Sequence, residues 1–74
     1  LLEHDVKIKD HCHICPGAKI GGGSEVQQSS LIGLGANVID KIKIGKNVTV
    51  GAGSTIFKNL KHNSTYIGYS KKIK

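Results

Sequence analysis

LIGLGANVIDKIKIGKNVTVGAGSTI, residues 31–56, carries an aliphatic residue at every sixth position. The repeat continues in both directions and covers ten hexads without a break. From the second hexad on, a small or apolar residue stands two positions before each aliphatic residue. The aliphatic positions are Leu2, Ile8, Ile14, Ile20, Val26, Ile32, Val38, Ile44, Val50 and Ile56.

A period of six matches neither the 3.6 residues of a helical turn nor the two-residue alternation of a single strand. It predicts a solenoid in which each hexad supplies one short strand and one corner. Three hexads then form a triangular coil of 18 residues, and each aliphatic residue stacks inward on the one 18 positions later. The expected fold is an all-β parallel β-helix shaped as a triangular prism. A run of hairpins is the alternative, and ten hexads in one register argue against it.

The length of the chain limits what such a coil can bury. Its 74 residues form one domain with a thin core, so we expect oligomerisation. The hexads predict a β-helix over residues 1–61 and a capping tail over residues 62–74, which would cover the open end. The chain starts within a hexad and lacks methionine, which suggests a fragment or a processed form.

The charge is unevenly distributed along the chain. Residues 1–40 hold three lysines and five acidic residues, whereas residues 41–74 hold eight lysines and no acidic residue. The C-terminal end is therefore a positive pole. A nucleic-acid partner is not expected, because arginine is absent and aromatic residues are few. Neither a membrane-crossing apolar run nor a signal-like segment is present.

The two cysteines form a C-x-x-C sequence in which the hexad frame turns Cys12 inward and Cys15 outward. Because they face opposite sides of one strand, neither a disulfide nor a shared metal ion is expected. Free thiols of this kind fit a protein of the reducing cytoplasm.

Three of the four histidines lie within EHDVKIKDHCH, residues 3–13. The frame places His4 and Asp5 at one corner, His11 at the next corner, and His13 on the outer side of a strand. A neutral imidazole can remove a proton from an attacking hydroxyl or amine, and a nearby carboxylate stabilises the imidazolium that forms. The cluster therefore holds candidate catalytic residues.

Three stretches of the chain resemble the catalytic domain of hexapeptide-repeat acetyltransferases: LEHDVKIKDHCHICPGAKIGGG (2–23), IKIGKNVTVGAGSTIFKNL (42–60) and STYIGYSKKIK (64–74). The similarity covers essentially the whole chain. It is strongest to the sugar O- and N-acetyltransferases that include sialic acid O-acetyltransferase and the UDP-amino-sugar N-acetyltransferase of bacillosamine synthesis. The resemblance implies that the β-helix is left-handed.

The resemblance also implies roles for individual residues. His4 matches the general base, and Asp5 matches the acid that assists it. His13, Leu34 and Ala52 match positions that contact acetyl-CoA, the expected co-substrate. The terminal G-x-P-A-K motif of the family is Gly-Tyr-Ser-Lys-Lys in residues 68–72, without the proline and the alanine.

The 18-residue coil gives the acetyl-CoA positions a common geometry. Leu34 and Ala52 occupy the same corner of successive coils above Pro16, and His13 begins the neighbouring outward column. A long ligand parallel to the solenoid axis would contact both columns and bring its phosphates to the positive pole. The candidate lysines there are Lys58, Lys71 and Lys72.

These observations predict a homotrimeric enzyme that transfers the acetyl group of acetyl-CoA to a hydroxyl or amine of a sugar or nucleotide sugar, without a metal ion. In the resembling family an additional N-terminal domain helps to bind the nucleotide sugar, and we expect this chain to lack it. Two alternatives stay open. One is a zinc enzyme of the γ-carbonic anhydrase type that uses His11, His13 and a neighbour's histidine. The other is a non-catalytic β-helix scaffold.

Overall fold

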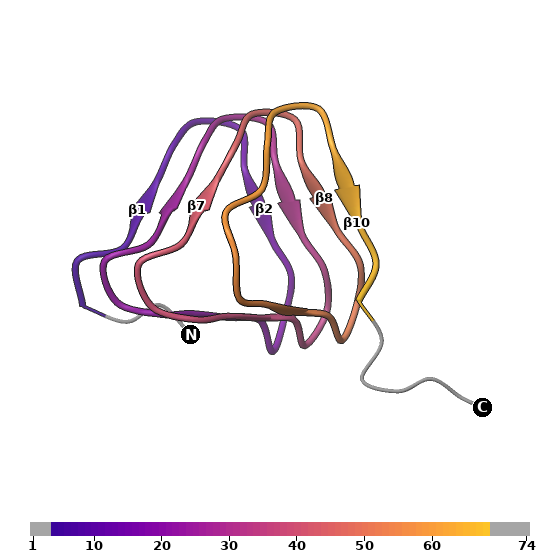
Figure 1. Ribbon diagram of the computed structural model, residues 1–74, viewed down its shortest axis with the longest axis horizontal. Helices are drawn as coiled ribbons and strands as arrows, with labels where there is room; N and C mark the ends of the chain where they lie inside the picture. The colour runs from indigo at the N-terminus through magenta and orange to yellow at the C-terminus, as the bar shows by residue number, and fades with distance from the viewer. Residues whose placement is uncertain (1–3, 69–74) are drawn as a thin grey trace.

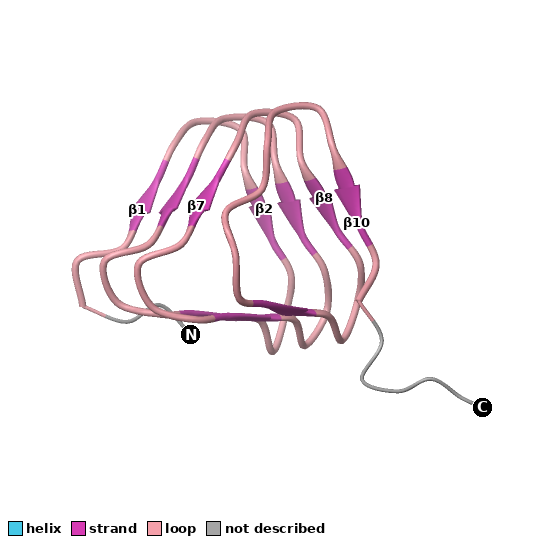
Figure 2. Ribbon diagram, in the orientation of Figure 1, coloured by secondary structure: helices cyan, strands magenta, loops and turns pink. Residues whose placement is uncertain are grey.

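The computed structural model describes residues 4–68, which coil into a parallel β-solenoid that contains no helix within that range (Figure 1). Each strand is two residues long, and loops turn the chain between the sides of a triangle (Figure 2). The strands are β1 (Lys7–Ile8), β2 (His13–Ile14), β3 (Lys19–Ile20), β4 (Glu25–Val26), β5 (Leu31–Ile32), β6 (Asn37–Val38), β7 (Lys43–Ile44), β8 (Thr49–Val50), β9 (Thr55–Ile56) and β10 (Thr65–Tyr66).

Three parallel sheets form the sides of the prism. Face 1 contains β1, β4 and β7, face 2 contains β2, β5, β8 and β10, and face 3 contains β3, β6 and β9. We name the three edges by the faces that they join: corner A leads from face 3 to face 1, corner B from face 1 to face 2, and corner C from face 2 to face 3.

The strand register confirms the predicted coil of 18 residues. Ile8 pairs with Val26, and Val26 pairs with Ile44, each 18 positions further along the chain. The other two faces follow the same rule up to β9, with the stacks Ile14–Ile32–Val50 and Ile20–Val38–Ile56. Leu2, the first aliphatic position, lies outside the described residues.

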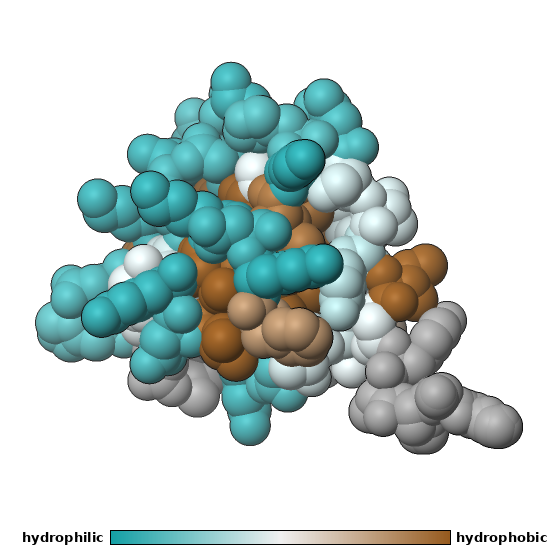
Figure 3. All heavy atoms as spheres, in the orientation of Figure 1, coloured by the Kyte–Doolittle hydropathy of each residue, from teal (hydrophilic) through white to brown (hydrophobic). Residues whose placement is uncertain are grey.

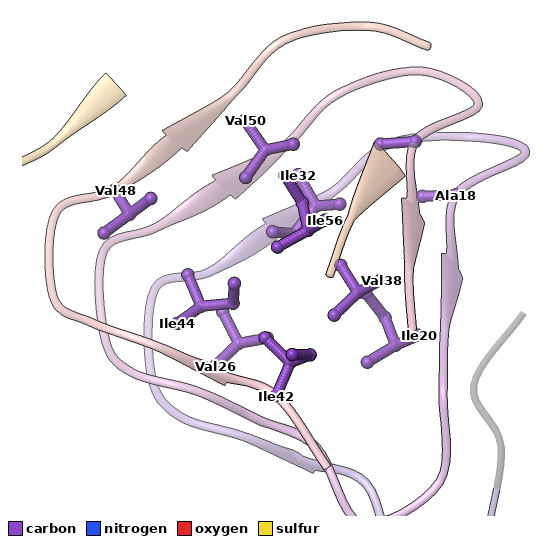
Figure 4. Packing of buried hydrophobic residues seen from close by; sticks show 11 residues of the cluster. Ala18, Ile20, Val26, Ile32, Val38, Ile42, Ile44, Val48, Val50 and Ile56 are labelled. Carbon is purple, nitrogen blue, oxygen red and sulfur yellow. The ribbon is translucent and has the colours of Figure 1, made fainter. Parts of the chain in front are cut away.

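The aliphatic residues of the hexads converge on the axis of the prism (Figure 4). The second residue of each strand points inward and the first points outward, as in Leu31–Ile32, where Leu31 is exposed and Ile32 is fully buried. The apolar residues two positions earlier complete this core. Its buried members are Ala18, Ile20, Val26, Ile32, Ala36, Val38, Ile42, Ile44, Val48, Val50 and Ile56.

Buried side chains near the corners also join successive coils by hydrogen bonds. The Ser30 hydroxyl donates to the Gly45 carbonyl at 2.7 Å and accepts from the Val48 N–H at 3.0 Å. The Cys12 thiol donates to the Gln27 carbonyl at 3.0 Å, which is the same step of 15 residues. Cys12 packs against the core, so its predicted inward position is confirmed.

Every corner but one contains a residue with a positive φ angle, three positions after the inward aliphatic residue. Four of these residues are glycines, for which this backbone conformation carries no steric cost. The non-glycine members include aspartate and asparagine, which tolerate it better than most residues. The positions are Asp5, His11, Gly17, Gly23, Ser29, Gly35, Lys41, Asn47, Gly53 and Asn63.

The fourth coil is two residues shorter than the others. Leu60 bridges to Ile44, and Tyr66 pairs with Val50, so both offsets are 16 residues instead of 18. The expectation that the hexad pattern stops after Leu60 is therefore wrong. A single step of four residues, from Ile56 to Leu60, shifts the frame, and the spacing of six then resumes up to Tyr66.

Two side chains replace hydrogen-bond acceptors at this shortened coil. The Asn59 Oδ1 atom accepts from the Lys43 N–H at 2.8 Å, and the His62 Nδ1 atom accepts from the Lys46 N–H at 2.7 Å. Gly45 lets the two coils approach here, because a Cβ atom at this position would lie 2.6 Å from the His62 nitrogen. The short coil is therefore firmly seated on the third.

Candidate active site

His4 and Asp5 form a hydrogen-bonded pair at corner A. The His4 Nδ1 atom lies 3.0 Å from the Asp5 Oδ2 atom, and the two side chains are 92% and 78% exposed. An ionised carboxylate can only accept a hydrogen bond, so this contact places a proton on Nδ1 and leaves the lone pair of neutral His4 on Nε2. The pair can therefore take a proton from a bound molecule through Nε2.

An open depression of about 340 Å³ lies beside His4 where face 3 meets corner A. Its floor has no side chains at Gly21 and Gly22, which lie in the coil above His4. Lys19 and Asp40 also line it, one cationic and one anionic. Within residues 4–68 neither of these two side chains is in a salt bridge. A small molecule in this depression would meet the proposed base and both charges.

The predicted acetyl-CoA positions lie elsewhere on the prism. His13 is exposed on face 2 and pairs in register with Leu31, which pairs in turn with Thr49. This column is the one predicted from the sequence. Leu34 and Ala52 are exposed at corner C.

Corner C stacks in the predicted order. The Gly35 N–H donates to the Pro16 carbonyl at 3.1 Å, and the Gly53 N–H donates to the Leu34 carbonyl at 2.8 Å. Leu34 therefore lies one coil above Pro16, and its neighbour Ala52 one coil above that. Leu34 is 56% exposed, so this corner offers an apolar contact.

Lys58 is exposed and follows β9 at corner A, where it lines a depression at the C-terminal end of the solenoid. In Figure 3 hydrophobic atoms gather near the centre of the view, with hydrophilic side chains around them. Lys71 and Lys72, the other candidates for phosphate contacts, lie outside the described residues.

A single chain does not bring all these residues together. His4 and Asp5 lie at corner A, whereas His13 lies on face 2, which joins corners B and C and is therefore opposite corner A (Figure 1). The expectation of one groove along one chain, shared by the candidate residues, is not met. A site that contains both groups requires a second copy of the chain.

Lys19 and Asp40 were not singled out from the sequence. Asp40 follows His4 by 36 residues, or two coils, with Gly22 midway. The stacking rule that groups Leu34 with Ala52 also groups these three residues. The spacing was therefore a usable signal, and the consecutive glycines marked where a floor without side chains would lie.

No group of three or more histidine, cysteine or acidic side chains within residues 4–68 has an arrangement suited to a metal ion. His11 lies at corner B, while His13 lies on face 2. Both cysteines are free, and Cys15 is partly buried. The described part of the chain also has no helix long and apolar enough to span a membrane.

The solenoid and its hexads define the molecule as a hexapeptide-repeat β-helix. No protein-family model matches the chain. It is 38% identical over 77 residues to serine acetyltransferase of Buchnera aphidicola subsp. Schizaphis graminum, a match that covers 99% of this chain and 29% of the relative. Serine acetyltransferase of Synechococcus elongatus is 28% identical over 74 residues, covering 89% of this chain and 30% of that protein.

The structural comparison agrees on the fold. Serine acetyltransferase of Neisseria gonorrhoeae, solved in complex with serine, superposes with a TM-score of 0.65 at 18% identity and covers 92% of this chain and 39% of that one. This match confirms the left-handed β-helix. The chain belongs with the hexapeptide-repeat acetyltransferases and spans about a third of the length of the curated relatives it matches.

Proposed function

We propose that this chain is the catalytic β-helix of an acetyl-CoA-dependent acetyltransferase. The observation that carries the proposal is the His4–Asp5 pair, held at 3.0 Å beside an open depression with a glycine floor. An exposed imidazole with a fixed partner and free space next to it meets the requirements of a general base. The acetyltransferase relatives supply the reaction class.

The reaction is a direct attack of the acceptor on the thioester. His4 Nε2 removes the proton of an acceptor hydroxyl or amine as that atom forms a bond to the acetyl carbon. The carbon–sulfur bond then breaks, and the proton passes from His4 to the departing thiolate of CoA. Asp5 holds the ring and stabilises the imidazolium between these steps. No covalent enzyme intermediate is needed.

Acetyl-CoA lies along face 2 and corner C, where it contacts His13, Leu34 and Ala52. The His4–Asp5 pair that serves this co-substrate comes from corner A of a neighbouring copy, because the two groups are opposed in one chain. A homotrimer with its three-fold axis parallel to the solenoid satisfies this requirement. Exposed Leu31, Leu34 and Phe57 give such an assembly apolar surface to bury.

The acceptor in this proposal is a sugar or nucleotide sugar, as the sequence resemblance implies. One observation favours a second candidate, a hydroxy-amino acid. Lys19 and Asp40 put one positive and one negative charge into the depression beside His4, which suits a carboxylate and an ammonium group on the same small molecule. Serine, the ligand in the Neisseria protein's structure, is such a molecule.

Thiol release from acetyl-CoA by the full-length protein tests the proposal, with serine, amino sugars and nucleotide amino sugars as acceptors. His4→Asn is expected to lower kcat about a hundredfold or more with the best acceptor. His11→Asn is the matched control, because it removes an exposed histidine at corner B. Turnover by His4→Asn equal to that of wild type would exclude His4 as the base.

A further inference from the structure

The shortened fourth coil leaves a second depression, of about 530 Å³, on face 1. It is separate from the depression beside His4, since the two share no lining residue. It also lies on a different face from His13 and a different corner from Leu34. The lining residues are Gln27, Lys43, Ile44, Gly45, Asn59, Leu60, Lys61 and His62.

The side chains at the step present hydrogen-bond donors to this space. The Oδ1 atom of Asn59 and the Nδ1 atom of His62 are both occupied by backbone N–H groups of the coil below. Asn59 is left with its amide NH₂ group, and neutral His62 with an N–H at Nε2. These backbone contacts fix both side chains, so the donors are oriented before any ligand arrives.

The charge of the lining is positive. Lys43 and Lys61 contribute ammonium groups, and the lining contains no carboxylate. The nearest acid by register is Glu25, one coil below Lys43. Its carboxylate accepts a hydrogen bond from the Gln27 amide, and within residues 4–68 no salt bridge joins it to Lys43. The two ammonium charges therefore remain available.

We propose that this depression binds the phosphate group of a small phosphorylated molecule, at a site distinct from that of acetyl transfer. Two ammonium groups and two oriented neutral donors match the several acceptor oxygens of a phosphate. The exposed part of Leu60 and the backbone at Gly45 form a wall against which the organic part of the ligand can pack. The four-residue step from Ile56 to Leu60 creates this site, because it brings Asn59 and His62 over the third coil.

Pyrophosphate is the probe for this site, titrated into the full-length protein by calorimetry at fixed ionic strength. Lys43→Gln/Lys61→Gln should weaken binding about tenfold or more, because two charge-assisted contacts are lost. Lys7→Gln/Lys9→Gln is the matched control, since it removes the same charge from the first coil near face 1, and should change affinity less than about threefold. Equal weakening by both pairs would overturn the proposal, because it would indicate a response to net charge alone.

Nuclear magnetic resonance of the wild-type protein gives a test that needs no variant. Pyrophosphate should shift the His62 ring signals and the Lys46 amide while leaving His4 unchanged. Shifts absent from these groups at millimolar pyrophosphate would overturn the site. Acetyl-CoA added afterwards should leave the shifts in place, and displacement of pyrophosphate by acetyl-CoA would overturn its separation from acetyl transfer. Inorganic phosphate, as a third ligand, should bind more weakly at the same residues.

Discussion

Asp40 lies directly over Gly21, so closely that a Cβ atom on Gly21 would come within 2.5 Å of the Asp40 Oδ1 atom and 2.6 Å of its backbone nitrogen. Gly21 is itself buried. The close approach stacks two coils at corner A and lets the carboxylate reach the depression that His4 lines. Packing and the proposed site therefore depend on the same missing side chain.

Gly21→Ala should destabilise the protein by about 1–3 kcal/mol, because backbone atoms of Ile39 and Asp40 would have to move. Thermal unfolding at constant protein concentration measures the loss. Gly51→Ala is the control at the equivalent position of corner C, where the nearest atom is the end of the flexible Ile67 side chain at 3.3 Å. Equal melting temperatures for the two variants would contradict the close approach at Gly21.

Ser30 is the second position where one side chain links two coils. Ser30→Ala should cost about 1–3 kcal/mol, because the buried Val48 N–H and the Gly45 carbonyl both lose a partner. Ser30→Cys should cost less, since the thiol of Cys12 already donates across the same step of 15 residues. Urea denaturation of the three proteins should give the order wild type, Cys, Ala. A Cys variant less stable than Ala would show that size outweighs hydrogen bonding here.

The part of the fold that follows from a strict period was predictable from the sequence. Repeats of six fixed which residues point inward, including Cys12, because each coil repeats the environment of the one below. The step at Leu60 was missed because a period carries no information about where it will be broken. The resumed spacing from Leu60 to Tyr66 and the turn-forming Asn63 were the signals of the new frame.

The candidate site was only partly predictable, for a related reason. The sequence placed His4 and His13 on the surface, but their separation depends on which side of the triangle each occupies. His4 and His13 are nine residues apart, which is half a coil and therefore the opposite side of the prism. Short separation in the chain suggested proximity, whereas the coil geometry separates them.

Asp5→Asn tests the carboxylate without disturbing the corner. Asp5 has a φ angle of 63°, a conformation that asparagine also tolerates, so the melting temperature should stay within about a degree. The activity should fall about tenfold or more, because an amide cannot balance the charge of the imidazolium. Acetyl transfer by Asp5→Asn at the wild-type rate would assign Asp5 a purely structural role.

Mixing two inactive variants tests whether the site is shared between copies. His4→Asn removes the base at corner A, and Leu34→Glu places a charge at the exposed acetyl-CoA contact at corner C. Each variant alone should be inactive. If each site takes corner A from one copy and corner C from the next, random assembly of equal amounts restores about a quarter of the sites, since half of the copies on each side are intact. A site built within one chain would give no recovery in the mixture, because every chain carries one of the two defects.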